Sequence, residues 1–376
     1  MRILYISHVR WGWIKQRPHF LAEGLAKNNQ VDYYYYQSRT HCKKDDFTSD
    51  IIPNSLHLTL KPFSLLPFKR IPIIGKWSFF DRINWLVMRW QLPSFMNYDV
   101  IWITHPSIYP QIKRAIRKNN KLVYDCMDDM IAFPEVKNQH NKVKFILTAE
   151  KQLLKKASLV FSSSDYLRKT ILKRARIERD IVVVNNAVQL PDNKAITSIE
   201  SLDVQRKLEE LSKLTNVFMY IGTISEWFDF EKMLRLVKDI PTLNIVLIGP
   251  KYAASIPNHP RFHLFGPIER QYIFTFMEKA KALIMPFVVN ELIESVNPVK
   301  LYEYIYSGKP SLASYYSETD SFKEFVYLYN SYDELKEYSI GIVEGKLLPQ
   351  SERNITRFIK ANTWEERIKQ IERELN

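Results

Sequence analysis

Glycine is scarce in this sequence, at only 9 of 376 residues. Two glycine-rich nucleotide-binding signatures are absent: the G-x-G-x-x-G fingerprint of dinucleotide-binding proteins and the G-x-x-x-x-G-K-[ST] loop of P-loop nucleotidases. The sequence therefore gives no support to either class. Cysteine is scarcer still, since Cys42 and Cys126 are the only two. Two cysteines cannot form a disulfide framework, and their number suits a reducing compartment.

Long apolar runs are also missing. No stretch of about 18 apolar residues occurs, so the sequence predicts no membrane-spanning helix. Residues 1–13 hold a short apolar run that ends in polar and basic residues, with no small-residue cleavage site. This pattern favours a buried first strand over a signal peptide. We therefore expect a cytoplasmic protein.

Acidic residues are in deficit. Lys and Arg number 54 against 41 Asp and Glu, which gives a formal net charge of +13. Such a charge favours an anionic partner, whether nucleic acid, acidic lipid or a phosphorylated ligand. The cations are dispersed and form no long basic run, so we expect no nucleic-acid arm.

Short β-rich runs alternate with helical stretches, and the alternation starts again near residue 215. This pattern predicts an α/β protein with two doubly wound parallel sheets. The expected strands are 2–7, 31–36, 100–104, 122–124, 159–162, 181–184, 217–221, 244–248, 261–264, 282–285 and 311–313. The expected helices include 18–27, 145–156, 230–238, 269–279, 298–306 and a terminal helix after Trp364.

The length of 376 residues fits two domains, at roughly 100–200 residues each. A polar, charged stretch at 189–214 separates the two halves. We place one Rossmann-like domain at 1–195 and a second at 210–355, with a C-terminal helix at 356–376 that can cross back to the first. Because open α/β sheets bind ligands beyond the carboxyl ends of their strands, two such domains predict a central cleft.

Three places in the second half favour an anionic ligand. Gly222 follows an apolar strand, where glycine lets the backbone approach a ligand, and Thr223 and Ser225 add hydroxyl donors. Gly266 follows another strand, and its neighbouring amides could read a nucleobase edge. Each place alone also fits an ordinary strand-to-helix turn.

The third place is the stretch from Asn297 to Glu303. We expect Asn297 to be the N-cap of a helix with Pro298 in its first position. Free amides and the helix dipole there form an anion site, and Lys300 in the first turn is unfavourable unless an anion binds. Glu303 lies about one turn further and could bind sugar or ribose hydroxyls. A capped helix with a solvated face is the equal alternative.

Residues 261–314 show the motif order of the donor half of GT-B glycosyltransferases. A strand ends at Phe265-Gly266-Pro267, an acidic loop follows at Asn290-Glu291-Leu292, and Gly308-Lys309-Pro310 comes after the capped helix. The first half is similar to these enzymes too, at Arg17-Pro18-His19 and at 124–129. The chain most resembles family-four-like bacterial exopolysaccharide and teichuronic-acid glycosyltransferases, including the xanthan glucuronosyltransferase type.

The resemblance implies a GT-B architecture with an acceptor domain first and a nucleotide-sugar domain second. It implies that Gly222 and Thr223 face the donor diphosphate, that Asn297, Val299 and Lys300 hold phosphate oxygens, and that Glu303 binds ribose. Family-four enzymes carry a Glu-x7-Glu motif. Its second glutamate matches Glu303, but Ser295 stands at the first position. The usual Arg and Lys after the first strand of this half are also replaced, so phosphate charge would fall more heavily on Lys300.

Catalytic candidates lie in the first half. Asp125, Asp128 and Asp129 cluster after a strand, and close carboxylates raise one another's pKa, which suits a base near neutral pH. The glucuronosyltransferase type favours Asp128, although an aspartate there could also cap the next segment. His105 ends a strand and could contact the donor sugar, as in related enzymes, or be structural.

Two further segments complete the prediction. In the N-terminal loop, Trp13 could stack on a sugar or pack in the core, and Arg17 could reach an anionic sugar or a phosphate. Residues 61–95 alternate basic and aromatic side chains, which is typical of an interfacial membrane element, although a buried helix also fits.

We thus expect a metal-independent glycosyltransferase without a cofactor, peripheral at the inner face of the cell membrane. It would transfer a sugar from a nucleotide-diphosphate sugar to a saccharide or lipid-diphosphate-linked acceptor in cell-surface polysaccharide synthesis. The alternatives are a nucleotide-sugar epimerase of similar fold and a non-catalytic basic protein that binds lipid or nucleic acid. The sequence leaves open the donor sugar and its nucleotide, the acceptor, the stereochemistry and the oligomeric state.

Overall fold

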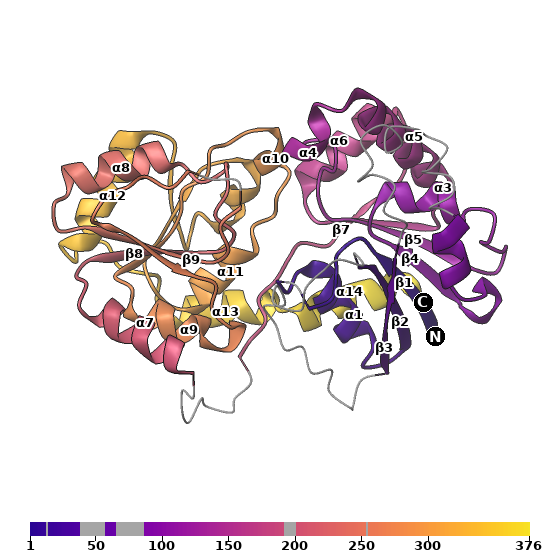
Figure 1. Cartoon of the computed structure of the whole chain (residues 1–376), viewed down its shortest axis with the longest axis horizontal. Helices are drawn as coiled ribbons and strands as arrows, with labels where there is room; N and C mark the ends of the chain where they lie inside the picture. The colour runs from indigo at the N-terminus through magenta and orange to yellow at the C-terminus, as the bar shows by residue number, and fades with distance from the viewer. Residues whose placement is uncertain (13, 38–56, 65–85, 192–200, 253–254) are drawn as a thin grey trace. The chain divides into compact units, whose positions relative to one another are not determined.

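The chain forms two compact units in a computed structural model, which describes residues 1–12, 14–37, 57–64, 86–191, 201–252 and 255–376. Unit 1 comprises Met1–Asn185 and Arg367–Asn376, and unit 2 comprises Asn186–Glu366. The final helix therefore begins in unit 2 and ends in unit 1 (Figure 1).

In unit 1, the described residues form a parallel seven-stranded sheet in the order β3-β2-β1-β4-β5-β6-β7. The strands are β1 (Arg2–Ser7), β2 (Gln30–Tyr36), β3 (Leu58–Phe63), β4 (Val100–Ile103), β5 (Lys121–Cys126), β6 (Leu159–Ser162) and β7 (Val182–Val183). The central strands are apolar and almost wholly buried, as expected for a parallel sheet covered on both faces.

Helices cover both faces of this sheet. They are α1 (Arg17–Leu25), α3 (Tyr109–Ile112), α4 (Pro134–Lys137), α5 (His140–Lys156), α6 (Asp165–Ala175) and α14 (Trp364–Leu375), with the 3-10 turns η4 (Phe95–Asn97) and η5 (Pro106–Ile108). Figure 1 shows α1 and α14 on one face and α3, α5 and α6 on the other. Gly24 allows α14 to approach α1, since a Cβ at this position would lie 2.4 Å from Cγ1 of Ile368.

Unit 2 repeats this design. Its described residues form a parallel six-stranded sheet in the order β10-β9-β8-β11-β12-β13. The strands are β8 (Val217–Ile221), β9 (Asn244–Ile248), β10 (Phe262–Gly266), β11 (Ala282–Met285), β12 (Ser311–Ser314) and β13 (Tyr327–Tyr329). The helices are α7 (Leu202–Ser212), α8 (Phe230–Asp239), α9 (Ile273–Lys279), α10 (Glu291–Glu294), α11 (Val299–Tyr306), α12 (Tyr332–Val343) and α13 (Glu352–Ala361), with η6 (Arg270–Tyr272) and η7 (Ser317–Phe322).

In both units the first strand lies in the middle of the sheet, and the chain builds outward from it first on one side and then on the other. The direction reverses between β1 and β4 in unit 1 and between β8 and β11 in unit 2. Ligands of open α/β sheets bind beyond the carboxyl ends of the strands at this reversal. The predicted pair of doubly wound α/β units is confirmed, and the sheet topology places a candidate site in each.

Two strands were missed by the sequence prediction, β3 and β13, and both lie at sheet edges. Strand β3 includes Lys61 and Phe63, so the start of the predicted interfacial segment is an edge strand that pairs with β2. Pro62 fits there because an edge strand tolerates a residue without a backbone N–H. Most of that segment, at 65–85, lies outside the described residues. Across the part of the chain that is described, no helix is both long and apolar enough to cross a bilayer.

Candidate functional site

The candidate site of unit 2 is built from Gly222 and Lys300. Gly222 directly follows β8, with a φ of +152°, and Lys300 lies in the first turn of α11. The lysine side chain occupies the space above the glycine: a Cβ on Gly222 would lie 2.1 Å from Cε of Lys300 and 2.9 Å from its Nζ. Only glycine leaves room for this ammonium group at the carboxyl end of β8.

The Lys300 ammonium lies among aromatic rings, with its Nζ 5.7 Å from the ring centroids of both Tyr220 and Phe287. Burial lowers its pKa, and the negative charge of Glu303 acts in the opposite direction. Within the described residues, Lys300 forms no ion pair. A cation held in this way at the positive end of a helix is suited to an anion that supplies the missing charge.

The predicted cap of α11 is wrong. The helix begins at Val299, its N-cap residue is Pro298, and no side chain caps it. Oδ1 of Asn297 instead accepts from the backbone N–H of Asn186 at 3.0 Å and from the hydroxyl of Tyr302 at 3.1 Å. Asn297 is thereby occupied by the segment that enters unit 2, and the first amides of α11 are left without a side-chain cap.

Glu303 is buried and paired with a residue that the sequence analysis missed. Its Oε1 accepts from Nη2 of Arg270 at 2.7 Å, and Nε of Arg270 donates to Oε1 of Gln189 at 3.3 Å. Arg270 begins η6, the turn that follows β10. The ion pair fixes one carboxylate oxygen of Glu303 and leaves the other without a hydrogen bond in the described chain.

Three other predicted donor-side residues, Thr223, Ser225 and Gly266, lie at or just after the carboxyl ends of β8 and β10. Thr223 follows Gly222, and its carbonyl accepts from the Tyr220 hydroxyl at 2.9 Å. Ser225 is buried in the same loop. Gly266 ends β10 with a φ of +69°, a conformation that favours glycine, and its carbonyl accepts from the N–H of Gly249 at 2.9 Å. The predicted roles of these residues stay predictions.

In unit 1, two of the three clustered aspartates are already engaged. Asp125 is fully buried and forms a bidentate ion pair with Arg17, whose Nη2 lies 2.8 Å from Oδ1; Arg17 also donates to the carbonyl of Val184 at 2.6 Å. Arg17 was expected to reach a ligand anion. Its charge is instead neutralised inside the unit.

Asp129 and Glu150 share a second arginine, Arg174. Nη1 of Arg174 lies 2.6 Å from Oδ1 of Asp129, and its Nε lies 2.7 Å from Oε2 of Glu150. This network ties α5 and α6 to the loop after β5. The sequence analysis did not single out Arg174, because a helical arginine facing distant carboxylates carries no local signal.

Asp128 differs from its two neighbours. In the described chain its carboxylate has no ion pair or side-chain hydrogen bond. Burial raises its pKa to about 6, the nearby carboxylates of Asp125 and Asp129 act in the same direction, and Arg17 opposes them. A free carboxylate with such a pKa is able to accept a proton near neutral pH.

His105 is the N-cap of η5 and lies two residues after the end of β4. Its Nδ1 accepts from the backbone N–H of Ser107 at 3.1 Å. The ring packs edge-on against His8, a residue that the sequence analysis missed, with centroids 5.2 Å apart. The sequence did contain a signal for His8, because this residue directly follows β1 just as His105 closely follows β4. Trp13, the remaining predicted residue, lies outside the described residues.

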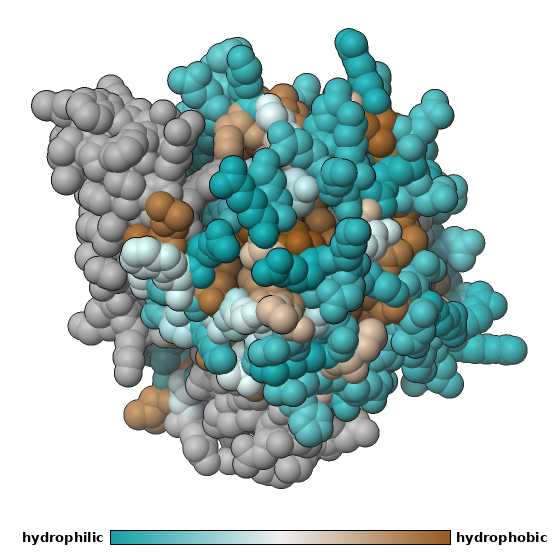
Figure 2. Space-filling view, turned by 90° about the vertical axis from the view of Figure 1, so that its right-hand side faces the viewer, coloured by the Kyte–Doolittle hydropathy of each residue, from teal (hydrophilic) through white to brown (hydrophobic). Residues whose placement is uncertain are grey.

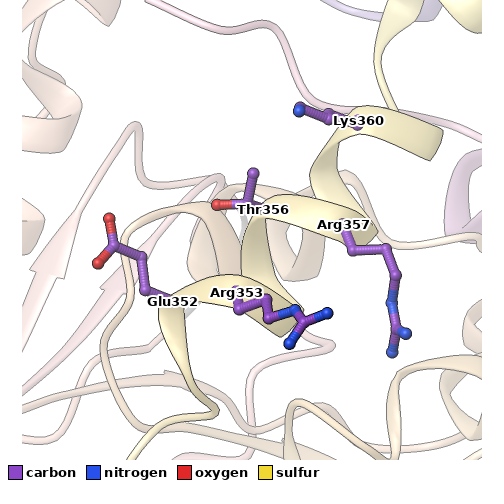
Figure 3. A pocket seen from close by; sticks show the side chains of 5 residues that line it. All are labelled: Glu352, Arg353, Thr356, Arg357 and Lys360. Atoms are coloured by element: carbon purple, nitrogen blue, oxygen red, sulfur yellow. The ribbon is translucent and has the colours of Figure 1, made fainter.

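One open cavity of about 580 Å³ lies elsewhere, on α13. Glu352, Arg353, Thr356, Arg357 and Lys360 line it, all from that single helix (Figure 3). None of the predicted site residues is among them, so this cavity does not mark the predicted chemistry. Among the described residues, no group of three His, Cys, Asp or Glu side chains is arranged to hold a metal ion.

Comparison with solved structures identifies the architecture. The chain aligns over 99% of its length with 98% of sucrose-phosphate synthase from Thermosynechococcus elongatus, at a TM-score of 0.72 and 14% identity. It aligns over its whole length with 99% of Anabaena HepE, solved with UDP, at a TM-score of 0.62 and 14% identity. The chain therefore has the GT-B fold, and the predicted resemblance to GT-B glycosyltransferases is confirmed.

Sequence comparison adds one named relative. TuaH of Bacillus subtilis, named provisionally as a teichuronic acid biosynthesis glycosyltransferase, is 25% identical over 242 residues. The match covers 61% of this chain and 59% of TuaH. No family model matches the sequence.

Proposed function

We propose that this protein is a glycosyltransferase that takes a sugar from a nucleotide-diphosphate donor. The observation that carries the proposal is the Lys300 ammonium, held over Gly222 at the amino end of α11 without a carboxylate partner in the described chain. It lies at the reversal of strand order in the unit 2 sheet, where an open α/β sheet receives its ligand. The relatives support the donor class, since HepE has been solved with UDP-glucose.

The proposed chemistry follows from the charges. As the bond between the sugar and the diphosphate breaks, negative charge grows on the leaving oxygen, and Lys300 with the free amides at the start of α11 stabilises it. The remaining Glu303 oxygen holds a ribose hydroxyl, with Arg270 fixing the carboxylate. In an inverting reaction Asp128 takes the proton of the attacking acceptor hydroxyl, because its carboxylate is free and its pKa is about 6.

We further propose a saccharide acceptor linked to a lipid diphosphate, at the inner face of the membrane, in cell-surface polysaccharide synthesis. Exposed apolar side chains of unit 1 support membrane contact: Trp90 is 83% exposed, Met96 69% and Leu86 53%. Arg89, beside Trp90, adds a positive charge for an acidic headgroup. The face of the molecule in Figure 2 is mostly hydrophilic, with hydrophobic groups between the hydrophilic ones.

Donor binding tests the proposal most directly. A panel of UDP-, GDP- and TDP-sugars should include one that raises the melting temperature of the wild-type protein, since a ligand at 100 times its Kd adds about 2.7 kcal/mol. Lys300→Met should abolish the shift, whereas Lys360→Met, a matched change on exposed α13, should retain it. Failure of every nucleotide sugar to bind would refute the proposal. Conversion of the donor without an acceptor would favour an epimerase.

Vesicle sedimentation tests the membrane proposal separately. Binding to vesicles with acidic lipid should exceed binding to neutral vesicles, and Trp90→Ala should reduce it. The matched control is Tyr252→Ala, which removes an aromatic side chain that is 54% exposed in unit 2. Equal binding of wild type and Trp90→Ala would contradict membrane contact through Trp90 without affecting the donor proposal.

A further inference from the structure

Two histidines meet where the strand order of unit 1 reverses. His8 directly follows β1 and His105 closely follows β4, and these strands are hydrogen-bonded neighbours. The two rings are in edge-to-face contact, with centroids 5.2 Å apart and an interplanar angle of 61°. The pair therefore lies at the edge of the sheet where a doubly wound fold receives its ligand.

The hydrogen bonds of His105 fix which of its ring nitrogens carries the proton. The backbone N–H of Ser107 donates to Nδ1 at 3.1 Å, and the Ser107 hydroxyl lies 2.7 Å from the same atom. A backbone N–H can only donate, so Nδ1 must be unprotonated and Nε2 carries the hydrogen. His105 thus presents an N–H donor away from its anchoring residue.

His8 reaches the same state through Thr104. The Thr104 hydroxyl oxygen accepts from the backbone N–H of His8 at 3.2 Å and lies 2.8 Å from His8 Nδ1. Thr104 is buried, and among the described residues its hydroxyl has no other acceptor. The hydroxyl therefore donates to Nδ1, which leaves the hydrogen of His8 on Nε2 as well.

Neither Nε2 is bonded to another group in the described chain. Burial lowers the pKa of His8 to about 4 and that of His105 well below its usual value, and the charges of His8 and Lys142 lower the pKa of His105 further. Both rings are therefore neutral at physiological pH. They offer two hydrogen-bond donors without positive charge, which match the oxygens of a neutral polyol better than those of a phosphate.

We propose that His8, anchored by Thr104, is a second sugar-binding donor beside His105, for which the family resemblance already implies a sugar contact, and that the Nε2–H of His8 holds a hydroxyl oxygen of a sugar ring. This inference rests on the proposed glycosyl transfer and extends it, because it assigns His8 and its anchor Thr104 to sugar recognition. The sugar is either the one transferred or the one that accepts it, and both present the same chemistry to the pair.

The test measures the wild type, His8→Leu and His8→Gln against UDP, UDP-glucose and the acceptor. We expect His8→Leu to leave the Kd for UDP unchanged and to weaken sugar binding about 3- to 10-fold, the range for one neutral hydrogen bond. His8→Gln should recover part of the loss, because its amide can donate from a similar position. Weaker binding of UDP-glucose assigns the donor sugar, and a raised acceptor KM with unchanged donor affinity assigns the acceptor. His140→Leu, an exposed change at the start of α5, is the matched control.

A second measurement excludes a merely structural role. Nitrogen NMR of the histidine rings should find the hydrogen on Nε2 in both His8 and His105, and Thr104→Val should change the state of His8 where Thr104→Ser does not. Hydrogen on Nδ1 of His8 in the wild type would overturn the subsite. Unchanged sugar affinity and acceptor KM in a folded His8→Leu protein would also overturn it. A wild type that binds no nucleotide sugar would instead remove the proposed function, and the subsite with it.

Discussion

Gly222→Ala is the substitution that most directly tests how the donor site positions Lys300. The added methyl group would lie 2.1 Å from Cε of Lys300 and 2.9 Å from its Nζ. Two atoms cannot remain that close, and a lysine side chain moves more easily than a strand end. The variant should therefore fold with the ammonium of Lys300 displaced from its place over β8.

The expected magnitude has two parts. The φ of Gly222 is +152°, a conformation that L-residues rarely adopt, so the fold should lose about 1–3 kcal/mol. Displacing the ammonium removes a hydrogen bond to a charged ligand, which contributes about 1.5–3 kcal/mol. The Kd for the nucleoside diphosphate should therefore rise about 10- to 150-fold.

Calorimetric titration with UDP and thermal unfolding measure the two parts separately. Gly345→Ala is the matched control, because Gly345 has a φ of +74° and nothing within 4 Å of an added Cβ. It should lower stability to a similar extent without changing UDP affinity. The double variant Gly222→Ala/Lys300→Met should bind no more weakly than Lys300→Met alone, since both changes remove the same contact.

Unchanged UDP affinity in a folded Gly222→Ala protein would refute the reasoning, as it would mean that Lys300 does not act from this position. Additive losses in the double variant would also refute it. They would show that Gly222 contributes through its own backbone and not by making room for the lysine.

Three further outcomes follow from the site. Asp128→Asn should lower the transfer rate at least about 100-fold, and the wild-type rate should rise with pH through about 6, because Asp128 must lose its proton to act. Arg174→Met should lower the free energy of unfolding in denaturant titrations by about 3–5 kcal/mol, since it leaves Asp129 and Glu150 buried without a cation. Glu303→Gln should weaken UDP about 10-fold by removing a charged hydrogen bond, with a much smaller effect on 2′,3′-dideoxy-UDP.

A different experimental result would contradict each of these three predictions. A pH–rate profile that is flat between 5 and 7 would exclude Asp128 as the base. The folded-state pKa of Asp128 is raised, so its burial costs stability as pH rises above about 4. Asp128→Asn should therefore be at least as stable as the wild type at pH 7.5. Wild-type stability in Arg174→Met would mean that the network is not structural. Equal losses for UDP and 2′,3′-dideoxy-UDP would remove the ribose contact from Glu303.

Much of the fold could be read from the sequence. Central strands such as β1 and β8 are buried on both faces, so they appear as continuous apolar runs bounded by polar residues. The edge strands β3 and β13 were not predicted, because a half-exposed strand contains both polar and apolar residues and pairs with a strand distant in sequence. The start of α11 was misplaced by one residue, since Asn297 and Pro298 both suit helix starts and only the bond to Asn186 decides between them.

The sequence alone determined which residue types follow each strand: a glycine after β8, aspartates after β5, histidines after β1 and β4, and a lysine opening α11. The tertiary structure alone decided which of them keep a free functional group. Arg17 and Asp125 lie 108 positions apart and neutralise each other, whereas Asp128 and Lys300 keep their charges without an ion pair in the described chain. Charge pairing depends on distances of a few ångströms across the fold, and a linear order of residues does not contain those distances.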